Sequence, residues 1–526
     1  MGDAIVFERV GFSYPDATQQ VLTDASFSVP EGAFVLVAGA TGAGKSTLLR
    51  AVNGLVPHFT GGTFAGRVEV MGRDTMSGAP RDLADVVGFV PQDPAASFVL
   101  DRVEDELAYA MENLGLERSM MRRRVEETLD LLDIEPLRDR EVRSLSAGER
   151  QRVAIAAAMT TAPRVLVMDE PTSQLDPQGA EDVLAALQRL VHDHGITAVV
   201  AEHRLERIAG FVDLAIACRT GIPPILDVPG DALERLGAGP PVARLGRLLG
   251  WSPTPLTVRQ ARRRAQVAPA PGAVPAPESN GRGDVLVRAE RVAAGYGARP
   301  VLACLDLELR AGEVAALMGR NGAGKTTLLR CLSGLHTPDT GRVRSGTGSP
   351  RPGVDVALCP QEPESLLFRE RVLDEITVTA RRGSAPVTAG EIIAALGLDG
   401  AEDRHPRDLS AGERLLVALG AVVATGAPVL LLDEATRGLD PATKVRLTSF
   451  LRRYASEGRA VLFATHDVEL VASLADRVVM IAGGEVIADG RPGDVLGDST
   501  VFAPQMTRVF GPGWLTPEQV AAAMPG

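Results

Sequence analysis

Two glycine-rich segments have the composition and spacing of phosphate-binding loops. GATGAGKS at 39–46 and GRNGAGKT at 319–326 both fit GxxxxGK[ST], each between an apolar run that suits a strand and a run that suits a helix. Glycines let backbone N–H groups and a helix N-terminus point at an anion. The lysine then reaches the terminal phosphates, and the Ser or Thr hydroxyl ligates magnesium. The sequence therefore predicts two sites for ATP and Mg²⁺. The residues predicted to contact nucleotide here are Gly39, Thr41, Gly42, Gly44, Lys45, Ser46, Thr47, Gly319, Asn321, Gly322, Gly324, Lys325, Thr326 and Thr327.

Two pairs of adjacent carboxylates follow apolar runs further along the chain. Asp169 and Glu170 follow VLVM, and Asp433 and Glu434 follow LLL. The aspartate at such a strand end can hold Mg²⁺ through water. The glutamate can orient and polarise the attacking water, because phosphoryl transfer depends mostly on positioning and charge neutralisation. We predict Glu170 and Glu434 as catalytic residues. The predicted magnesium ligands in these two motifs are Ser46, Asp169, Thr326 and Asp433.

The segments that must position these residues occur twice in the sequence. The phosphate loops, the segments SLSAGERQRVAIAAAM (144–159) and DLSAGERLLVALGAVV (408–423), and the acidic strand ends recur in the same order. Such a recurrence indicates duplication of a whole domain. The continuous apolar runs before the carboxylates favour strands of a parallel sheet that is buried on both faces. Ligand sites of such α/β sheets lie at the carboxyl edge.

The domain boundary is predicted at a segment rich in Pro, Ala and Gly. We expect a first domain at 1–265, a semi-extended linker at 266–284 and a second domain at 285–526. The tails of both domains also resemble each other, at 241–261 and 504–523. Each domain is therefore expected to end in a small helical appendage.

Bulk composition excludes several classes of protein. The 526 residues are too many for one ordinary domain, and the net charge of -12 argues against wrapping nucleic acid. No stretch approaches the roughly 18 apolar residues that span a bilayer, and the first residues lack a signal-peptide pattern. We expect a cytosolic protein unless another subunit holds it at a membrane. The four cysteines form no CxxC pair, which favours core residues over a zinc site.

The duplicated LSAGE segments, beside the phosphate loops and carboxylates, resemble the signature motif of ATP-binding-cassette (ABC) proteins. The family norm is LSGGQ, so 145–149 and 409–413 differ at the third and fifth positions. The resemblance implies an α/β fold of two tandem P-loop ABC ATPase domains. Each would have a RecA-like core sheet, an antiparallel β subdomain, a helical signature subdomain and the appendage. It also implies that each signature completes the nucleotide site of the opposing domain, through Ser146 and Gly148 or Ser410 and Gly412.

The same resemblance implies further site residues. Tyr14 and Tyr296 would stack on adenine, and Gln92 and Gln361 would sense magnesium and water as catalytic residues and metal ligands. His203 and His466 would contact the terminal phosphate as catalytic switch residues. Asp176 and Asp440 would end loops that cross the domain interface. His192 and His194, in a polar stretch, are interpreted as a solvated helix end.

The segment after Gln92, ending in ENLGL, resembles the energy-coupling-factor (ECF) branch of ABC importers. That resemblance implies a motor subunit for uptake of a vitamin or transition-metal ion. The implied partners are a transmembrane T-type subunit and a small substrate-binding membrane subunit, with no nucleic acid. The implied location is the cytoplasmic face of the membrane. The second domain lacks ENLGL, so its docking surface is less defined.

Three questions stay open at this point. A tandem ABC ATPase acting on ribosomes or nucleic acid is the main alternative, although such proteins carry a long charged linker or cysteine zinc modules. A non-hydrolysing regulatory module is disfavoured because Glu170 and Glu434 are both present. The two domains could pair head to tail within one chain or between chains. Ala435, at the place of Pro171, hints at unequal sites.

Overall fold

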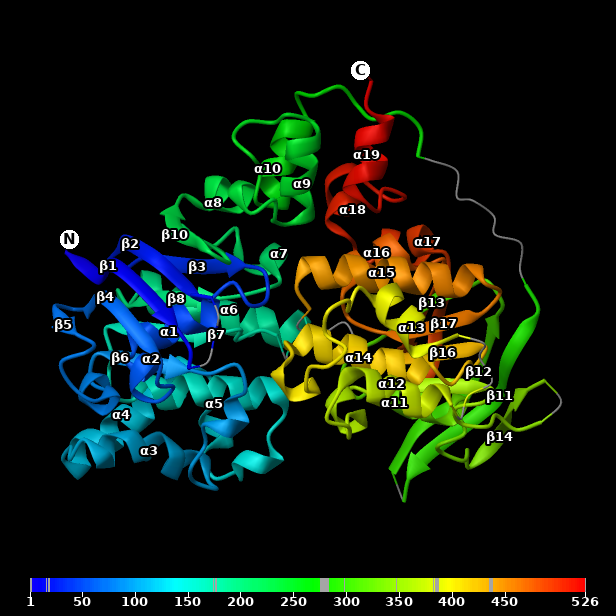
Figure 1. The fold of residues 1–526 in the computed structure, drawn as a ribbon, viewed down its shortest axis with the longest axis horizontal. Coiled ribbons are helices and arrows are strands. Elements are labelled where there is room, and N and C mark those ends of the chain that lie inside the picture. Colours follow the sequence, from blue (N-terminus) through cyan, green and yellow to red (C-terminus); the bar gives the residue numbers. More distant parts are fainter. Residues whose placement is uncertain are drawn as a thin grey trace. The chain divides into compact units, whose positions relative to one another are not determined.

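The computed structural model describes the residues in the ranges 2–15, 17, 19–173, 175, 177–274, 283–297, 299–346, 348–381, 383, 387–434 and 439–525. The contacts between residues divide the chain into two compact units (Figure 1). The first is Met1–Arg244 with Ser252–Thr257, and the second is Leu245–Trp251 with Val258–Gly526.

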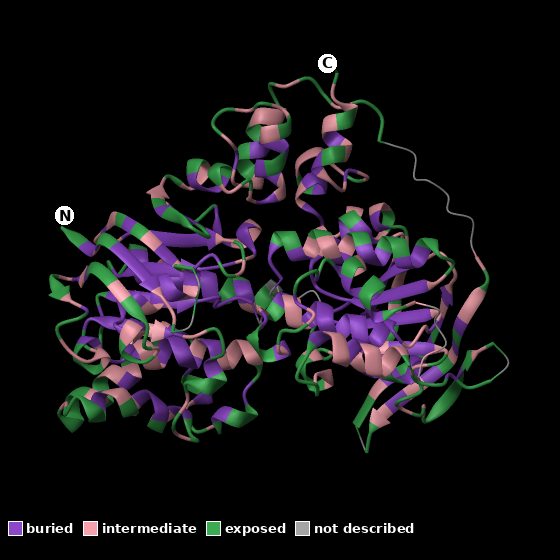
Figure 2. Cartoon of the chain, viewed as in Figure 1, coloured by how far each residue is buried: buried purple, intermediate pink, exposed green. Residues whose placement is uncertain are grey.

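A six-stranded sheet forms the centre of the first unit in the described residues. Its neighbouring strands run parallel except at one edge, where β10 is antiparallel to β9. Every residue of β7 and β8 is buried, as expected of strands covered on both faces, and Figure 2 shows the sheet mostly as buried. The strands in spatial order are β10 (Ile222–Asp227), β9 (Leu214–Arg219), β3 (Phe34–Gly39), β8 (Thr197–Ala201), β7 (Val165–Asp169) and β6 (Val87–Val90).

An antiparallel sheet and flanking helices complete the body of the first unit. The antiparallel strands, in spatial order, are β2 (Leu22–Pro30), β1 (Asp3–Ser13), β4 (Thr63–Val70) and β5 (Arg73–Asp74). The helices associated with the two sheets are α1 (Lys45–Val52), α2 (Leu55–His58), α6 (Pro177–His192) and α7 (Leu205–Ile208). The helices between β6 and β7 form the signature subdomain and are α3 (Val103–Asn113), α4 (Arg118–Leu131) and α5 (Ala147–Met159).

The second unit repeats this plan. Its large sheet has the spatial order β15 (Val356–Cys359), β16 (Val429–Asp433), β17 (Ala460–Ala464), β13 (Val314–Met318), β18 (Arg477–Ala482) and β19 (Glu485–Gly490). Its antiparallel strands are β12 (Arg299–Arg310), β11 (Val285–Tyr296) and β14 (Thr340–Ser345). Its helices are α11 (Lys325–Leu332), α12 (Val372–Ala380), α13 (Ala389–Leu396), α14 (Ala411–Val423), α15 (Pro441–Ser456) and α16 (Val468–Leu474). The predicted fold class, with a parallel core sheet in each half, is thus confirmed.

Short helices follow the last strand of each large sheet, as the repeated tails predict. They are α8 (Pro229–Arg235), α9 (Pro241–Leu248) and α10 (Val258–Ala265) in one tail, and α17 (Pro492–Gly497), α18 (Gln505–Phe510) and α19 (Pro517–Ala523) in the other. By contact α10 groups with the second unit, where it packs on α18 (Figure 1). The Nε–H of Arg262 donates to the carbonyl oxygen of Arg508 at 2.7 Å. The boundary at 265 therefore stays a prediction, and most of the predicted linker, 275–282, lies outside the described residues.

Two properties of the described residues bear on membranes and on thiol chemistry. No helix in the described ranges is both long and apolar enough to cross a membrane. Cys218, Cys331 and Cys359 are buried, as expected of small core residues, whereas Cys304 is exposed.

The strand order determines where the chemistry lies. In the first unit β3, β8 and β7 are parallel neighbours, so their carboxyl ends meet at one edge. The phosphate loop follows β3, His203 follows β8 and Glu170 follows β7. The sheet therefore gathers at one edge three residues or loops that are far apart in the sequence.

Candidate nucleotide sites

Each phosphate loop lies between a core strand and a helix, as predicted. Gly44 and Gly324 have φ angles of 90° and 105° directly before α1 and α11. A Cβ at Gly44 would lie 2.8 Å from the carbonyl oxygen of Val21, so glycine is required there for both conformation and space. Within the described ranges, neither helix start receives a capping hydrogen bond from a side chain. The first backbone N–H groups of both helices are therefore suited to bind phosphate oxygens.

The two loop lysines lie across their own loops. Lys45 Nζ donates to the carbonyl oxygens of Gly39 and Ala40, both at 3.0 Å. Lys325 Nζ donates to the carbonyl oxygens of Gly319 at 2.8 Å and Arg320 at 3.3 Å. Both ammonium groups are thus held inside the loops. A terminal phosphate that binds there would replace the carbonyl oxygens as the hydrogen-bond acceptors of the lysines. The other residues predicted to contact nucleotide lie in the turn or on the helix that follows it: Thr41, Gly42, Ser46, Thr47, Asn321, Gly322, Thr326 and Thr327.

Asp169 and Asp433 end β7 and β16 beside the hydroxyls of the loops. Burial raises the pKa of the Asp169 carboxyl, against the opposing effect of a hydrogen bond from Ser46. Burial likewise raises the pKa of Asp433, against a hydrogen bond from Thr326. Oδ1 of Asp433 is buried and has no hydrogen-bond partner among the described residues. A buried carboxylate oxygen without a donor beside a hydroxyl oxygen fits the hard-oxygen site that Mg²⁺ needs, so these residues would hold the ion.

Glu170 and Glu434 have unusual backbone geometry at the same point of the repeat. Both have a φ of 52°, a region that glutamate rarely adopts. The N–H of Glu170 donates to the carbonyl oxygen of Ala201 at 2.9 Å, and that of Glu434 to Ala464 at 3.0 Å. Each glutamate is therefore tied to the end of the neighbouring strand. Strain that occurs twice at one position favours a functional role over an accident of folding.

The first site brings three predicted residues together around one carboxylate. The Nε2 amide of Gln92 donates to Oε2 of Glu170 at 2.9 Å. Nε2 of His203 lies 3.0 Å from Oε1 of the same carboxylate, and both side chains are more than nine-tenths buried. Gln92, Glu170 and His203 follow three different strands, β6, β7 and β8, which are neighbours in the sheet. The cluster therefore forms because these strand ends are adjacent.

The second site arranges the corresponding residues differently. Nδ1 of His466 lies 2.9 Å from Oε1 of Glu434, and Nζ of Lys325 lies 3.6 Å from the same oxygen. Within the described residues neither Oε1 of Glu434 nor Nδ1 of His466 completes a hydrogen bond, so these contacts are electrostatic. Gln361 is exposed, as Gln92 is, but the described part of the chain contains no hydrogen bond between Gln361 and Glu434 that would match the one from Gln92 to Glu170. In this site the glutamate thus faces the phosphate-binding lysine.

The two tyrosines that were predicted to stack on adenine differ in their hydrogen-bond partners and in the contacts of their rings. The Tyr14 hydroxyl is 3.0 Å from Oγ1 of Thr47, and its ring packs edge-on against Phe12. Tyr14 is thereby joined to helix α1 of its own phosphate loop. Tyr296 is 47% exposed and its hydroxyl accepts from Arg330 at 3.3 Å, with its ring near His336. Both tyrosines are thus linked to their loop helices, Tyr14 through Thr47 on α1 and Tyr296 through Arg330 on α11.

The signature serines begin helices α5 and α14. Ser146 accepts a hydrogen bond from the backbone N–H of Glu149, whose carboxylate accepts the N–H of Ser146 at 2.7 Å. Ser410 and Glu413 repeat this capping box. This reciprocal capping explains why glutamate is accommodated at the fifth signature position. Gly148 and Gly412 lie in the first turns of the two helices.

Two aspartates, Asp176 and Asp440, were predicted to end loops that cross the domain interface. Asp440 is buried and caps its own helix, accepting the N–H groups of Ala442 and Thr443 at 2.9 and 3.0 Å. Asp176 and Ala435 lie outside the described residues. The observed function of Asp440 is thus to stabilise the start of α15.

One site residue that the sequence did not single out is Glu202, beside His203. It is 2% exposed and accepts hydrogen bonds from two loops of the first site. The sequence did contain a signal for Glu202. The residue directly before the predicted switch histidine is a carboxylate in the first copy and a threonine, Thr465, in the second. Its partner Thr172 lies thirty residues away, and only the sheet shows that they meet.

Two phosphate loops, each accompanied by a buried aspartate and an adjacent glutamate at the end of a parallel strand, define a doubled P-loop ATPase. The sequence pattern of the ABC transporter family matches residues 22–173 and 302–437, and the chain belongs to that family. It is an ATPase with two ABC domains that uses ATP with Mg²⁺.

Relatives extend over the whole chain. A Streptomyces coelicolor protein named "Putative ABC transporter ATP-binding protein" is 48% identical over 99% of this chain and 100% of its own length. A Methanosarcina mazei protein of the same name is 33% identical over 94% of this chain and 90% of its own. Among solved structures, archaeal ribosome recycling factor aABCE1 matches with a TM-score of 0.61 at 22% identity, over 94% of this chain and 95% of that one. At that identity the likeness shows the fold alone.

Proposed function

We propose that this chain is the ATP-hydrolysing motor subunit of an ECF-type importer that takes up a vitamin or a transition-metal ion. Its proposed partners are a transmembrane T-type subunit and a small substrate-binding membrane subunit, which hold it at the cytoplasmic face of the membrane. The names of the relatives, as ABC transporter ATP-binding proteins, support the transport assignment. The segment ending in ENLGL supports the ECF branch.

The observation that carries this proposal is a repeated exposure of apolar side chains after the two Q-loop glutamines. Val99 is 59% exposed and Phe368 is 80% exposed, at corresponding positions after Gln92 and Gln361. Exposed large apolar side chains at a repeated position mark an interaction surface better than scattered ones do. A membrane subunit that docks there would act directly on the loop that carries the site glutamine.

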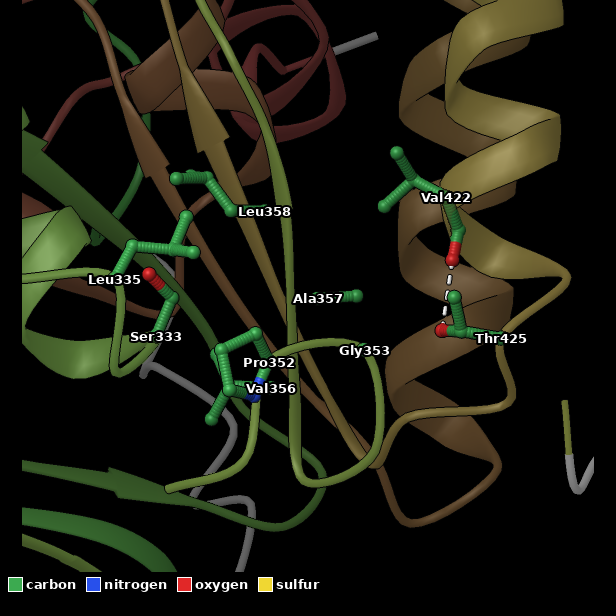
Figure 3. Close-up of a pocket in the computed structure, with 9 residues that line it drawn as sticks. All are labelled: Ser333, Leu335, Pro352, Gly353, Val356, Ala357, Leu358, Val422 and Thr425. Carbon is green, nitrogen blue, oxygen red and sulfur yellow. Dashed lines mark hydrogen bonds between the residues drawn. The ribbon is translucent and has the colours of Figure 1, made fainter. Parts of the chain in front are cut away.

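The second unit adds a small apolar cavity near this loop. It has a volume of about 160 Å³ and is lined by the end of α11, the loop at 352–353, strand β15 and the end of α14 (Figure 3). Leu335, Leu358 and Val422 supply much of its apolar lining, and Leu335 is 60% exposed. Since β15 leads directly to Gln361, an apolar side chain of a membrane subunit seated here would contact the strand that positions the glutamine.

The proposed chemistry at the first site uses the residues already placed. Lys45 and the α1 N–H groups neutralise the phosphates, and Ser46 and Asp169 would hold Mg²⁺, which supplies further charge neutralisation when bound. Glu170 orients a water whose oxygen attacks the γ-phosphorus as the bond to the β–γ bridging oxygen breaks. Gln92 and His203 orient Glu170. The second site would use the equivalent residues, with Lys325 nearer to its glutamate.

We further propose that the two domains pair head to tail. Ser410 would then contact the ATP held by Lys45, and Ser146 the ATP held by Lys325. The uncapped N-termini of α1 and α11 favour a bound triphosphate electrostatically, and the serine hydroxyls at the starts of α5 and α14 would add hydrogen-bond donors from the opposing domain. ATP binding would favour the closed pair and hydrolysis the open one, which shifts the attached membrane subunit between states.

Affinity capture from the membranes of the native organism tests the importer assignment. We expect the full-length chain to co-purify with two hydrophobic membrane proteins, and the double variant Val99→Asp, Phe368→Asp to lose them while it keeps basal ATPase activity. Ile487→Asp is the matched control, because Ile487 is also 59% exposed but lies on β19. Co-purification of ribosomes or nucleic acid in place of membrane proteins would contradict the proposal and favour the soluble alternative.

A further inference from the structure

Glu202 is a buried carboxylate that joins two loops of the first site. Its Oε1 accepts hydrogen bonds from the backbone N–H of Thr172 at 2.9 Å and from the Thr172 hydroxyl. Its Oε2 accepts from the backbone N–H groups of His203 at 2.9 Å and Arg204 at 3.4 Å. A 2% exposed carboxylate is costly unless donors compensate for the water it has lost, and here four donors do so.

These hydrogen bonds connect the backbones on both sides of the catalytic contact. Thr172 lies two residues after Glu170, and His203 follows Glu202 directly. The contact between Oε1 of Glu170 and Nε2 of His203 is 3.0 Å long. The loop carrying the glutamate and the loop carrying the histidine are therefore held at a set separation by a third residue. Among the described residues, Glu202 forms no hydrogen bond or ion pair with the side chain of Glu170 or of His203.

The second unit places threonine where the first has Glu202. Oγ1 of Thr465 accepts the N–H of Asp467 at 3.1 Å. The Asp467 carboxylate in turn accepts the N–H of Leu470 at 3.1 Å and the Nζ–H of Lys444 at 2.7 Å. The second switch loop is thus tied to helices α15 and α16. A hydroxyl group therefore stands in the second unit at the position of the Glu202 carboxylate.

We infer that Glu202 is a positioning residue for hydrolysis at the first nucleotide site. It sets the distance between Glu170 and His203 without contacting nucleotide. A buried carboxylate therefore fixes the arrangement of the hydrolytic residues in the first site. The inference rests on the proposed roles of Glu170 and His203 in hydrolysis, and it is independent of the importer assignment.

The test uses the full-length chain with the second site silenced by Glu434→Gln. In that background we expect Glu202→Gln to lower kcat by about tenfold to a hundredfold with the KM for ATP unchanged, because misplacing a catalytic group by about 1 Å costs on that order. Glutamine presents N–H groups to at least one pair of donors, while its size is conserved. Glu202→Thr, which installs the residue of the second unit, should show a similar loss.

Asp213→Asn is the matched control, because Asp213 accepts the N–H of Phe34 at the opposite end of β3. It should leave kcat and KM unchanged. Thr172→Val removes only the hydroxyl donor to Glu202, and we expect a smaller loss of kcat, about threefold to tenfold, with the KM unchanged; this variant serves if Glu202→Gln does not fold.

Three outcomes distinguish a failure of the inference from a failure of the assignment on which it rests. An unchanged kcat in folded Glu202→Gln, or in Thr172→Val where only that variant folds, would overturn the positioning role. Full turnover in the double variant Glu170→Gln, Glu434→Gln would instead overturn the assignment of the glutamates. A loss of Glu202→Gln activity that appears wholly as a raised KM would also overturn the positioning role.

Discussion

The two nucleotide sites share their strand ends, loops and strained glutamates but differ in the partners of those glutamates. In the first site the Glu170 carboxylate accepts a hydrogen bond from the amide of Gln92 and lies beside His203. In the second, Glu434 lies beside His466 and 3.6 Å from Lys325. Duplication has therefore preserved the backbone that positions the carboxylate more strictly than the side chains that orient it. We expect the first site to be the better arranged for hydrolysis.

Replacing the glutamates should have the largest effect on this comparison. Glu170→Gln should keep ATP binding but slow hydrolysis at the first site by about 10²-fold or more, because the group that orients the water is lost. It should also favour the closed pair of domains. Steady-state ATPase assays and nucleotide-binding assays on the full-length chain measure both effects.

Glu434→Gln is the comparison variant for that experiment. We expect it to leave more of the total turnover than Glu170→Gln does. Equal losses would show that the different glutamate partners do not matter, and intact turnover in both single variants would refute the catalytic assignment.

Replacing the loop lysines should have the next largest effect. Lys45→Ala should weaken ATP binding at one site only, by about 10- to 100-fold, since a charged hydrogen bond contributes roughly 1.5–3 kcal/mol. Lys325→Ala should do the same at the other site, and it also removes the positive charge beside Glu434. Titration with a fluorescent ATP analogue, read as one or two binding events, checks this. Loss of binding at both sites in either variant would indicate tight coupling between them.

Neutralising a magnesium carboxylate should change stability in a pH-dependent way. Because the folded-state pKa of Asp169 is raised by burial, its contribution to stability is full below the ordinary carboxyl pKa and is lost as pH rises through the raised value. Asp169→Asn lacks that loss of stability, so at neutral pH without nucleotide it should unfold at a higher temperature than the wild-type chain. Thermal unfolding between pH 4 and pH 8 measures the effect.

Magnesium provides the control for this prediction. With Mg²⁺ and ATP the wild-type chain should gain more stability than Asp169→Asn, and EDTA should remove that difference. Asp433→Asn should behave in the same way, since burial raises the pKa of Asp433 as well. A wild-type chain that gained stability with rising pH relative to both variants would contradict the direction of these shifts.

The smallest expected effect separates the two tyrosines. Tyr14→Phe loses the contact between the hydroxyl and Thr47 and should cost about 1 kcal/mol of unfolding free energy. Tyr296→Phe loses a hydrogen bond from Arg330 that is 3.3 Å long and lies at an exposed residue, and it should cost about 0–0.5 kcal/mol. Urea denaturation of both variants gives the comparison, and equal costs would remove this difference between the sites.

Much of the fold and the core of both sites followed from the sequence, because the features concerned are local. A glycine before a helix that needs a positive φ, as at Gly44, and a fully apolar run before Asp169 constrain the backbone within a few residues. Because each motif occurs twice, every interpretation of one copy could be checked against the other copy. The ATPase class and the parallel core sheets were predictable for this reason.

Tertiary structure alone decided which side chains meet. The hydrogen bond between Gln92 and Glu170 spans 78 residues, and that between Thr172 and Glu202 spans 30. Both exist because β6, β7 and β8 are neighbours in a sheet whose spatial order differs from chain order. The grouping of α10 with α18 likewise depends on packing between distant segments. Motif residues are determined by local backbone demands, whereas their orientation depends on long-range contacts that periodicity and spacing do not encode.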